Sequence, residues 1–218
     1  LYDNDGGEYL SSDGATLSVV AGGASAMKLD ANSRISLSNN DVSGATNNTV
    51  FGYAAGNALE SGGTNNAIFG HNAGLVLTTG DHNAIFGYTS ADSLLTGGQN
   101  ISIGTGTLAA ATDVDRVVAI GNYACGDSDV TAAADATVAI GFGALQALTE
   151  GIGNVAIGAF ALDAEDDGDY NTAVGYQALT AQTGTTGTVA NTAIGYNAGL
   201  AITKGRYNTI IGKGALAA

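Results

Sequence analysis

The stretch NTAIGYNAGLAITKGRYNTIIG, from Asn191 to Gly212, contains one complete copy of a unit that recurs along most of the chain. The unit opens with Asn, continues with two small or β-branched residues and a large apolar residue, and then has Gly. The same opening returns 17 residues later. A short repeat of this kind is typical of solenoids and fibres, because each unit is too small to bury its own apolar face and must stack on the next.

Ten copies of this opening occur between Asn48 and Gly212, and their glycines are separated by 18, 17, 17, 17, 20, 17, 17, 20 and 17 residues. The two 20-residue units carry their additional residues in polar or small-residue stretches. We expect these stretches to be loops, since loops tolerate insertions. The glycine column consists of Gly52, Gly70, Gly87, Gly104, Gly121, Gly141, Gly158, Gly175, Gly195 and Gly212.

A large apolar residue precedes every glycine of this column, and we predict that it forms the core ladder of the fold. The residue before it is Ala in five units and Val or Ile in four. Because side chains alternate faces along a strand, both faces of each strand are apolar. Such strands are normally covered on both sides, so a second chain is the expected cover. The predicted core ladder consists of Phe51, Phe69, Phe86, Ile103, Ile120, Ile140, Ile157, Val174, Ile194 and Ile211.

Three further positions recur with the period of the repeat. Asn opens eight of the ten units, and stacked amides pair along the axis or cap turns, so we interpret this Asn as structural. The invariant Gly indicates a close backbone approach that a Cβ would obstruct. Ala stands three residues after the Gly in eight units, where we expect a second short strand to begin.

These columns predict an all-β fold, a parallel β-roll or β-solenoid of about ten 17-residue coils, each with two strands and two turns. Ten coils at ~4.8 Å each make a rod of about 50 Å. An Ala-rich helix in each unit is the rival interpretation, but glycine interrupts the pattern too often. Residues 1–47 read as short strands joined by turns and form an N-terminal β-rich fibre segment, expected to intertwine with other chains; residues 48–218 form the shaft.

The composition excludes several classes of partner. The formal charge of −14 comes from 20 acidic and 6 basic residues, which opposes binding to nucleic acid or to an anionic membrane surface. The chain contains no apolar run of ~18 residues and no basic region followed by an apolar stretch, so we expect neither a membrane span nor a signal peptide. The single cysteine, Cys125, occupies a column of Leu, Gly and Ala and is expected to be a small buried filler.

The pattern N-[TSV]-[VA]-I-G, with Ala three residues after the Gly, resembles the head repeats of trimeric autotransporter adhesins. Longer units such as Asn191 to Thr209 are similar to the shaft repeats of bacteriophage tail fibres, and the stretches YDNDGGEYLSSDG and KLDANSRISLSNND are similar to what precedes such repeats. The resemblance implies a left-handed homotrimeric fibre whose partners are its own copies, other fibre or tail proteins, and a host surface glycan or protein. It also implies a location in the virion or at a cell surface.

One acidic loop has the composition of a metal site. In DAEDDGD, acidic residues alternate around Gly168 as at the start of an oxygen-rich calcium loop. The twelfth position is Val174 rather than Glu, so a solvated acidic turn is the competing interpretation. Asp3, Asn4 and Asp5 offer a weaker copy. The candidate calcium ligands are Asp163, Glu165, Asp167 and Asp169.

No other constellation indicates a cofactor or a catalytic site. His71 and His82 lie on turn-like positions and share no fixed spacing with a nucleophile or a third ligand. A broken aromatic column follows the glycines, and we favour packing over stacking against sugars as its role. It consists of Tyr53, His71, Tyr88, Phe142, Tyr176 and Tyr196.

The sequence therefore predicts a structural protein and not an enzyme, the trimeric rod of a tail fibre or similar appendage that supports attachment to a host. Two alternatives remain open. One is a bacterial trimeric adhesin head that binds matrix or glycan. The other is a monomeric ligand-binding β-solenoid, such as an ice-binding protein, although its expected Thr rows do not extend through all coils.

Overall fold

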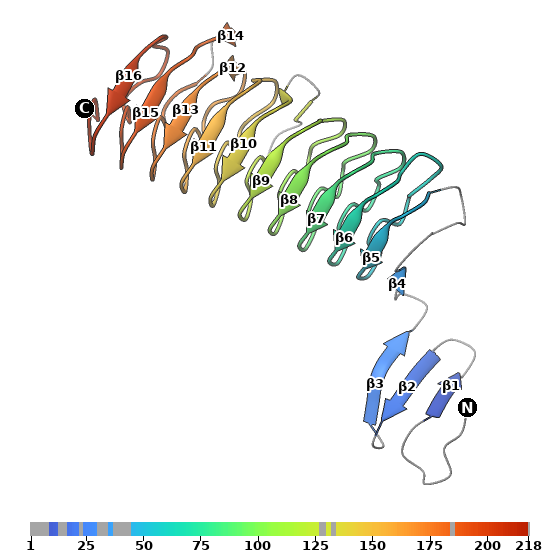
Figure 1. Ribbon diagram of the computed structural model, residues 1–218. Coiled ribbons are helices and arrows are strands. Elements are labelled where there is room, and N and C mark those ends of the chain that lie inside the picture. The colour runs from blue at the N-terminus through green and yellow to red at the C-terminus, as the bar shows by residue number, and fades with distance from the viewer. Residues whose placement is uncertain are drawn as a thin grey trace.

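The computed structural model describes residues 9–12, 17–21, 24–29, 35–36, 45–126, 130–131, 134–183 and 186–217. Within them the chain is all-β and contains no helix; ten short parallel strands stack into a solenoid of about nine turns (Figure 1). The β-solenoid expected from the 17-residue period is confirmed. Asp3, Asn4 and Asp5 lie outside the described residues.

The ten parallel strands are each three residues long, and corresponding repeat positions are paired along the whole sheet. Sheet order follows chain order from β5 to β16. The strands are β5 (Thr49–Phe51), β6 (Ala67–Phe69), β7 (Ala84–Phe86), β8 (Ile101–Ile103), β9 (Val118–Ile120), β10 (Val138–Ile140), β11 (Val155–Ile157), β13 (Thr172–Val174), β15 (Thr192–Ile194) and β16 (Thr209–Ile211).

Two smaller groups of strands accompany this sheet. In the N-terminal segment, β1 (Tyr9–Ser12), β2 (Leu17–Ala21) and β3 (Ala24–Leu29) form an antiparallel sheet, and β4 (Ile35–Ser36) pairs antiparallel with β5. Late in the solenoid, β12 (Gly168–Asp169) pairs with β14 (Gly187–Thr188).

The inward side chain of each parallel strand is the middle one. Val50, Ile68 and Ala139 are examples, and this column is at most 3% exposed throughout. The residue predicted as the core ladder comes one position later, so it faces outward in the single chain, and that prediction is wrong. The physical reason is that both columns are apolar, and alternation alone does not say which one is inside. The outward column is Phe51, Phe69, Phe86, Ile103, Ile120, Ile140, Ile157, Val174, Ile194 and Ile211.

The expected second strand of each coil is a turn. The Ala three residues after the Gly is buried, as at Ala144, but the next residue has a left-handed backbone, as at Leu145 with φ of 50°. A chain that enters this region every few residues cannot stay extended. Each coil is therefore one strand closed by turns, and the turns bring their apolar side chains back over the inner face of the sheet.

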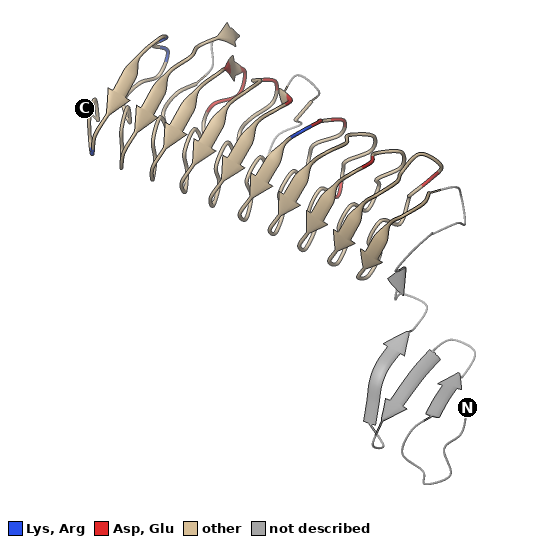
Figure 2. Cartoon of the chain, in the orientation of Figure 1, with Lys and Arg blue, Asp and Glu red and all other residues tan. Residues whose placement is uncertain are grey.

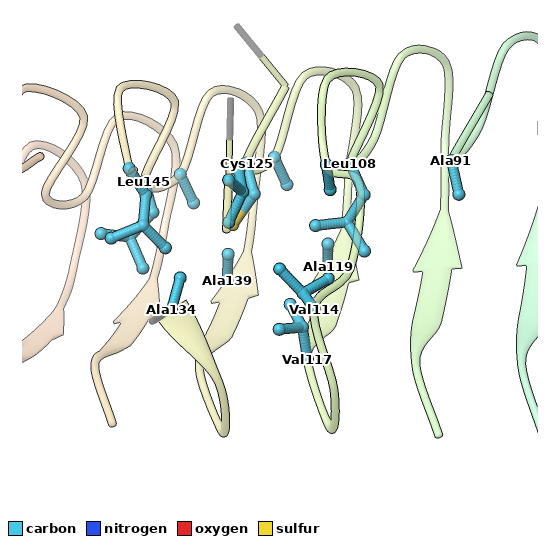
Figure 3. Packing of buried hydrophobic residues seen from close by; sticks show 14 of the residues in the cluster. Ala91, Leu108, Val114, Val117, Ala119, Cys125, Ala134, Ala139 and Leu145 are labelled. Atoms are coloured by element: carbon cyan, nitrogen blue, oxygen red, sulfur yellow. The ribbon is translucent and has the colours of Figure 1, made fainter. Parts of the chain in front are cut away.

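Side-chain volume is balanced between this left-handed turn residue and the inward strand residue of the next coil. Where the strand has Ile the turn has Gly. Where the strand has Ala the turn has Leu or Cys, as in the pairs Leu108 with Ala119 and Cys125 with Ala139 (Figure 3). A Cβ on Gly74 would lie 3.3 Å from Cδ1 of Ile85. The pairs are Gly56 with Ile68, Gly74 with Ile85, Ala91 with Ser102, Leu108 with Ala119, Cys125 with Ala139, Leu145 with Ala156, Leu162 with Ala173, Leu179 with Ala193, and Gly199 with Ile210.

This balance predicts a strong coupling between Gly74 and Ile85. Gly74→Leu overpacks the interior at a cost of about 1–3 kcal/mol, and Ile85→Ala leaves a cavity that costs about 2–5 kcal/mol. The double variant is expected to be more stable than Ile85→Ala, because it recreates the Leu–Ala pairs found further along the rod. Urea unfolding of the four proteins measures the coupling, and additive effects would contradict it.

A column of buried asparagines joins consecutive coils. Asn83 is 2% exposed; its Nδ2 donates to the carbonyl of Gly97 at 2.9 Å, and its Oδ1 accepts the backbone N–H of Asn100 at 3.0 Å. Asn66 repeats this arrangement one coil earlier, with Gly80 and Asn83 as partners. The structural role predicted for the Asn is confirmed, and each amide satisfies two backbone groups that have no water to bond.

Candidate functional site

The outward face of the long sheet is the surface of the solenoid that most needs explanation. Each of its ten rows presents two residues, and none of the thirty strand residues is charged. Ile103, Ile157 and Ile194 are 38–41% exposed. An apolar strip of this length on a soluble monomer is unusual, because exposed apolar patches larger than a few hundred Å² generally mark a binding surface.

Charge lies elsewhere on the rod. Figure 2 shows acidic residues on the loops that connect the coils and on the short strand β12, whereas the ten parallel strands of the long sheet carry none. Some of these carboxylates link coils: Asp135 accepts the N–H of Asp115 at 2.8 Å and pairs with Arg116 at 3.0 Å. The apolar face and the acidic loops are therefore separate surfaces, one suited to contact and the other to solvent.

The aromatic column lies at the turn after each strand and is exposed. Tyr53, Tyr88, Phe142, Tyr176 and Tyr196 are 43–56% exposed, because the Gly turns the chain away from the sheet. The rings nevertheless pack on one another.

Ring contacts run from coil to coil in this column. Centroids are 4.9 Å apart for Tyr53 and His71, 5.3 Å for His71 and Tyr88, and 5.5 Å for Tyr176 and Tyr196, all stacked. Phe142 makes edge contacts with Tyr123 and with Phe160, which lie one position later in their coils, outside this column. A sugar stacks on an open ring face; a neighbouring ring covers one face of each of Tyr53, Tyr88, Tyr176 and Tyr196 and both faces of His71, which favours packing.

Each histidine has local partners. His71 is held between two tyrosines, and Nδ1 of His82 lies 3.0 Å from Asp81 while its Nε2 lies 3.3 Å from Asn65. Neither is grouped with a nucleophile in these contacts. Cys125 is fully buried as expected, and burial raises the pKa of its thiol to about 12, so it stays protonated at neutral pH.

The predicted calcium ligands do not converge as a set of four. Asp163 accepts a hydrogen bond from Thr180, and Asp169 accepts the N–H of Ile152 at 3.0 Å. Among the described residues, the acidic groups that come within 4.8 Å of one another are Glu165, Asp166 and Asp167. The alternation seen in the sequence places its outer members toward neighbouring coils, where they bond protein rather than one common point.

Glu165 has an unusual environment. It occupies an inward column that holds Leu77, Leu94 and Leu148 in other coils, and it is fully buried. Its Oε1 accepts the N–H of Gly168 at 2.8 Å, and the amide of Gln182 donates to its other oxygen.

The burial of this carboxyl changes its acidity. Burial raises the pKa of Glu165 because it removes water from the charged form, the bonds from Gln182 and Gly168 oppose this, and the nearby Asp166 and Asp167 add to it.

The raised pKa of Glu165 predicts that stability falls as pH rises. The folded state holds the proton more tightly than the unfolded state, so this contribution is fully present below the unfolded pKa of about 4.5 and is lost as pH rises through the higher folded pKa. Glu165→Gln is expected to flatten the dependence of the melting temperature on pH in that window. Glu60→Gln, which removes an exposed glutamate, is the matched control, and equal flattening by both variants would contradict the role of burial.

No protein-family model, curated protein or solved structure matches the chain. In the part of the chain that the structure describes, no helix is both long enough and apolar enough to cross a membrane.

The structure thus assigns different roles to the repeated columns and to the acidic loop. The glycine and asparagine columns join the coils, the predicted core ladder is the outward surface, and the acidic loop is divided between neighbours. The balance of side-chain volume between the turn residue and the inward strand residue was not predicted from the sequence. It is nevertheless visible when the units are aligned, because the turn position is large where the inward strand position is small, and small where that position is large.

Proposed function

We propose that this chain is a structural fibre protein, which forms a rod by association of three copies and supports attachment of a tail fibre or similar appendage to a host surface. The observation that carries the proposal is the uncharged and mostly apolar outer face of the sheet, which runs the length of a solenoid whose interior is already filled by other side chains.

The size of this face supports association between copies. Ten rows at ~4.8 Å and three residues of ~3.3 Å give a footprint of about 500 Å² before side-chain relief is counted. A stable interface takes about 800 Å² from each partner, which is the same order. A partner that covers all ten rows needs the same row spacing, and a second copy of this chain has it.

The inter-coil bonds support a mechanical role. Every coil is joined to the next by strand pairing and by turn bonds such as the N–H of Thr78 to the carbonyl of Leu95 at 2.8 Å. Except at Val117 and Thr137, the amide of a buried Asn adds a further link to the next coil. These ladders run along the rod axis, and bending or local unfolding has to break them. A spacer that holds a binding tip away from its anchor requires this stiffness. The proposed role is not catalytic, and its partners are the chain's own copies, other fibre or tail proteins, and a host glycan or protein.

Light scattering of the native protein tests the proposal. Three copies of the 21.4 kDa chain are expected in each particle, with an elongated shape in small-angle X-ray scattering. A monomer would overturn the trimeric rod and favour a single-chain ligand-binding solenoid. A trimer that itself binds immobilised glycan or matrix would favour the adhesin alternative.

A further inference from the structure

The outward face is not uniform along the rod. In β5, β6 and β7 the second outward residue is Phe, and the rings of Phe51, Phe69 and Phe86 stack with centroids 5.2 and 4.8 Å apart and planes within 11° of parallel. The first outward residue of these strands is small, Thr49, Ala67 or Ala84. These three coils therefore present a tall aromatic ridge beside a low step.

The next coils have a flush face. In β8 to β11 the two outward residues are Ile with Ile or Val with Ile, so neither column stands above the other. The combined bulk of each row is similar, since Phe with Ala is replaced by Val with Ile. A straight partner can therefore lie at one distance along the rod only if tall residues meet low ones in the first three coils.

This requirement distinguishes two ways of pairing the face. If the ridge of one copy met the ridge of another, facing phenyl rings would hold the copies apart at β5 to β7 and open the contact between the isoleucines further along. If the ridge meets the step, the spacing is constant. Contact between unlike columns occurs in a two-fold pair, where each ridge meets the other copy's step, and equally in a closed ring of three, where the ridge of each copy meets the step of the next.

We propose that the ridge formed by Phe51, Phe69 and Phe86 of one copy packs on the step formed by Thr49, Ala67 and Ala84 of the next, and that this contact is the strongest part of the association. The inference rests on the proposed self-association and adds its contact residues. Aromatic side chains are enriched in the cores of protein interfaces, and large side chains in well-packed pockets without water carry most of the binding energy.

Filling the step tests the proposal. Ala67→Phe with Ala84→Phe is compared with Ala67→Ser with Ala84→Ser, which keeps the step low; both pairs lie on the outward face. Phe favours strands more than Ser does, so weaker strand formation cannot explain a loss in the Phe variant. Circular dichroism and thermal unfolding check that both variants keep the solenoid.

The expected result is that the parent and the Ser variant have the same oligomeric mass, while the Phe variant associates about tenfold more weakly or worse. An unchanged mass and dissociation profile in the Phe variant would overturn this inference and leave the proposed rod standing. Equal loss in both variants would also overturn it, because size would not be the cause. A monomeric parent would overturn both the inference and the rod.

Discussion

Gly87→Ala is expected to unfold the coils on either side of it. Gly87 has φ of 144°, a conformation that side chains rarely adopt, and an added Cβ would overlap the carbonyl oxygen of Gly104 in the next coil. The backbone strain costs about 1–3 kcal/mol and the overlap about as much again, so we expect a loss of roughly 2–6 kcal/mol in urea unfolding followed by circular dichroism.

Gly212→Ala is the matched control for this prediction. Gly212 has the same kind of backbone, with φ of 123°, but no atom lies within 4 Å of an added Cβ. It retains the strain and removes the overlap, so its expected cost is about 1–3 kcal/mol. If both variants lost the same free energy, close approach of successive coils would not be the reason for Gly in this column.

Asn83→Ala has the second largest expected effect. The substitution leaves the carbonyl of Gly97 and the N–H of Asn100 buried without their partner. An unpaired buried group costs about 1–3 kcal/mol, so the pair is expected to cost roughly 4 kcal/mol in the free energy of unfolding. Hydrogen exchange should be faster at the amide of Asn100 than in the parent protein.

Val117→Ala provides the comparison for Asn83→Ala, since Val117 occupies the same column without an amide. It loses only apolar contacts, for an expected cost of about 1–2 kcal/mol. A similar loss in the two variants would mean that the column contributes packing rather than hydrogen bonds.

The positions of these columns were predictable from the sequence because each arises from backbone geometry repeated once per coil. Any residue with a Cβ fails at Gly87, and a short amide reaches both groups at Asn83, so Gly returns in all ten units and Asn in eight of them. The acidic loop was less predictable, because whether Asp163 and Asp169 converge depends on which coil each one faces.

The sequence alone determined that the chain is a stack of similar coils, where the coils begin, and which residues are fixed by close approach and by buried amides. Only the tertiary structure decided which apolar column is inside. Phe86 and Ile85 are equally apolar neighbours whose side chains point to opposite faces of the strand. The turn that crosses behind the strand decides which of the two is inside. Gly74 in that turn leaves room for Ile85, and nothing in the same chain covers Phe86 fully. Alternation of side chains along a strand produces two apolar faces, and the volume of the turn residue decides which face lies inside.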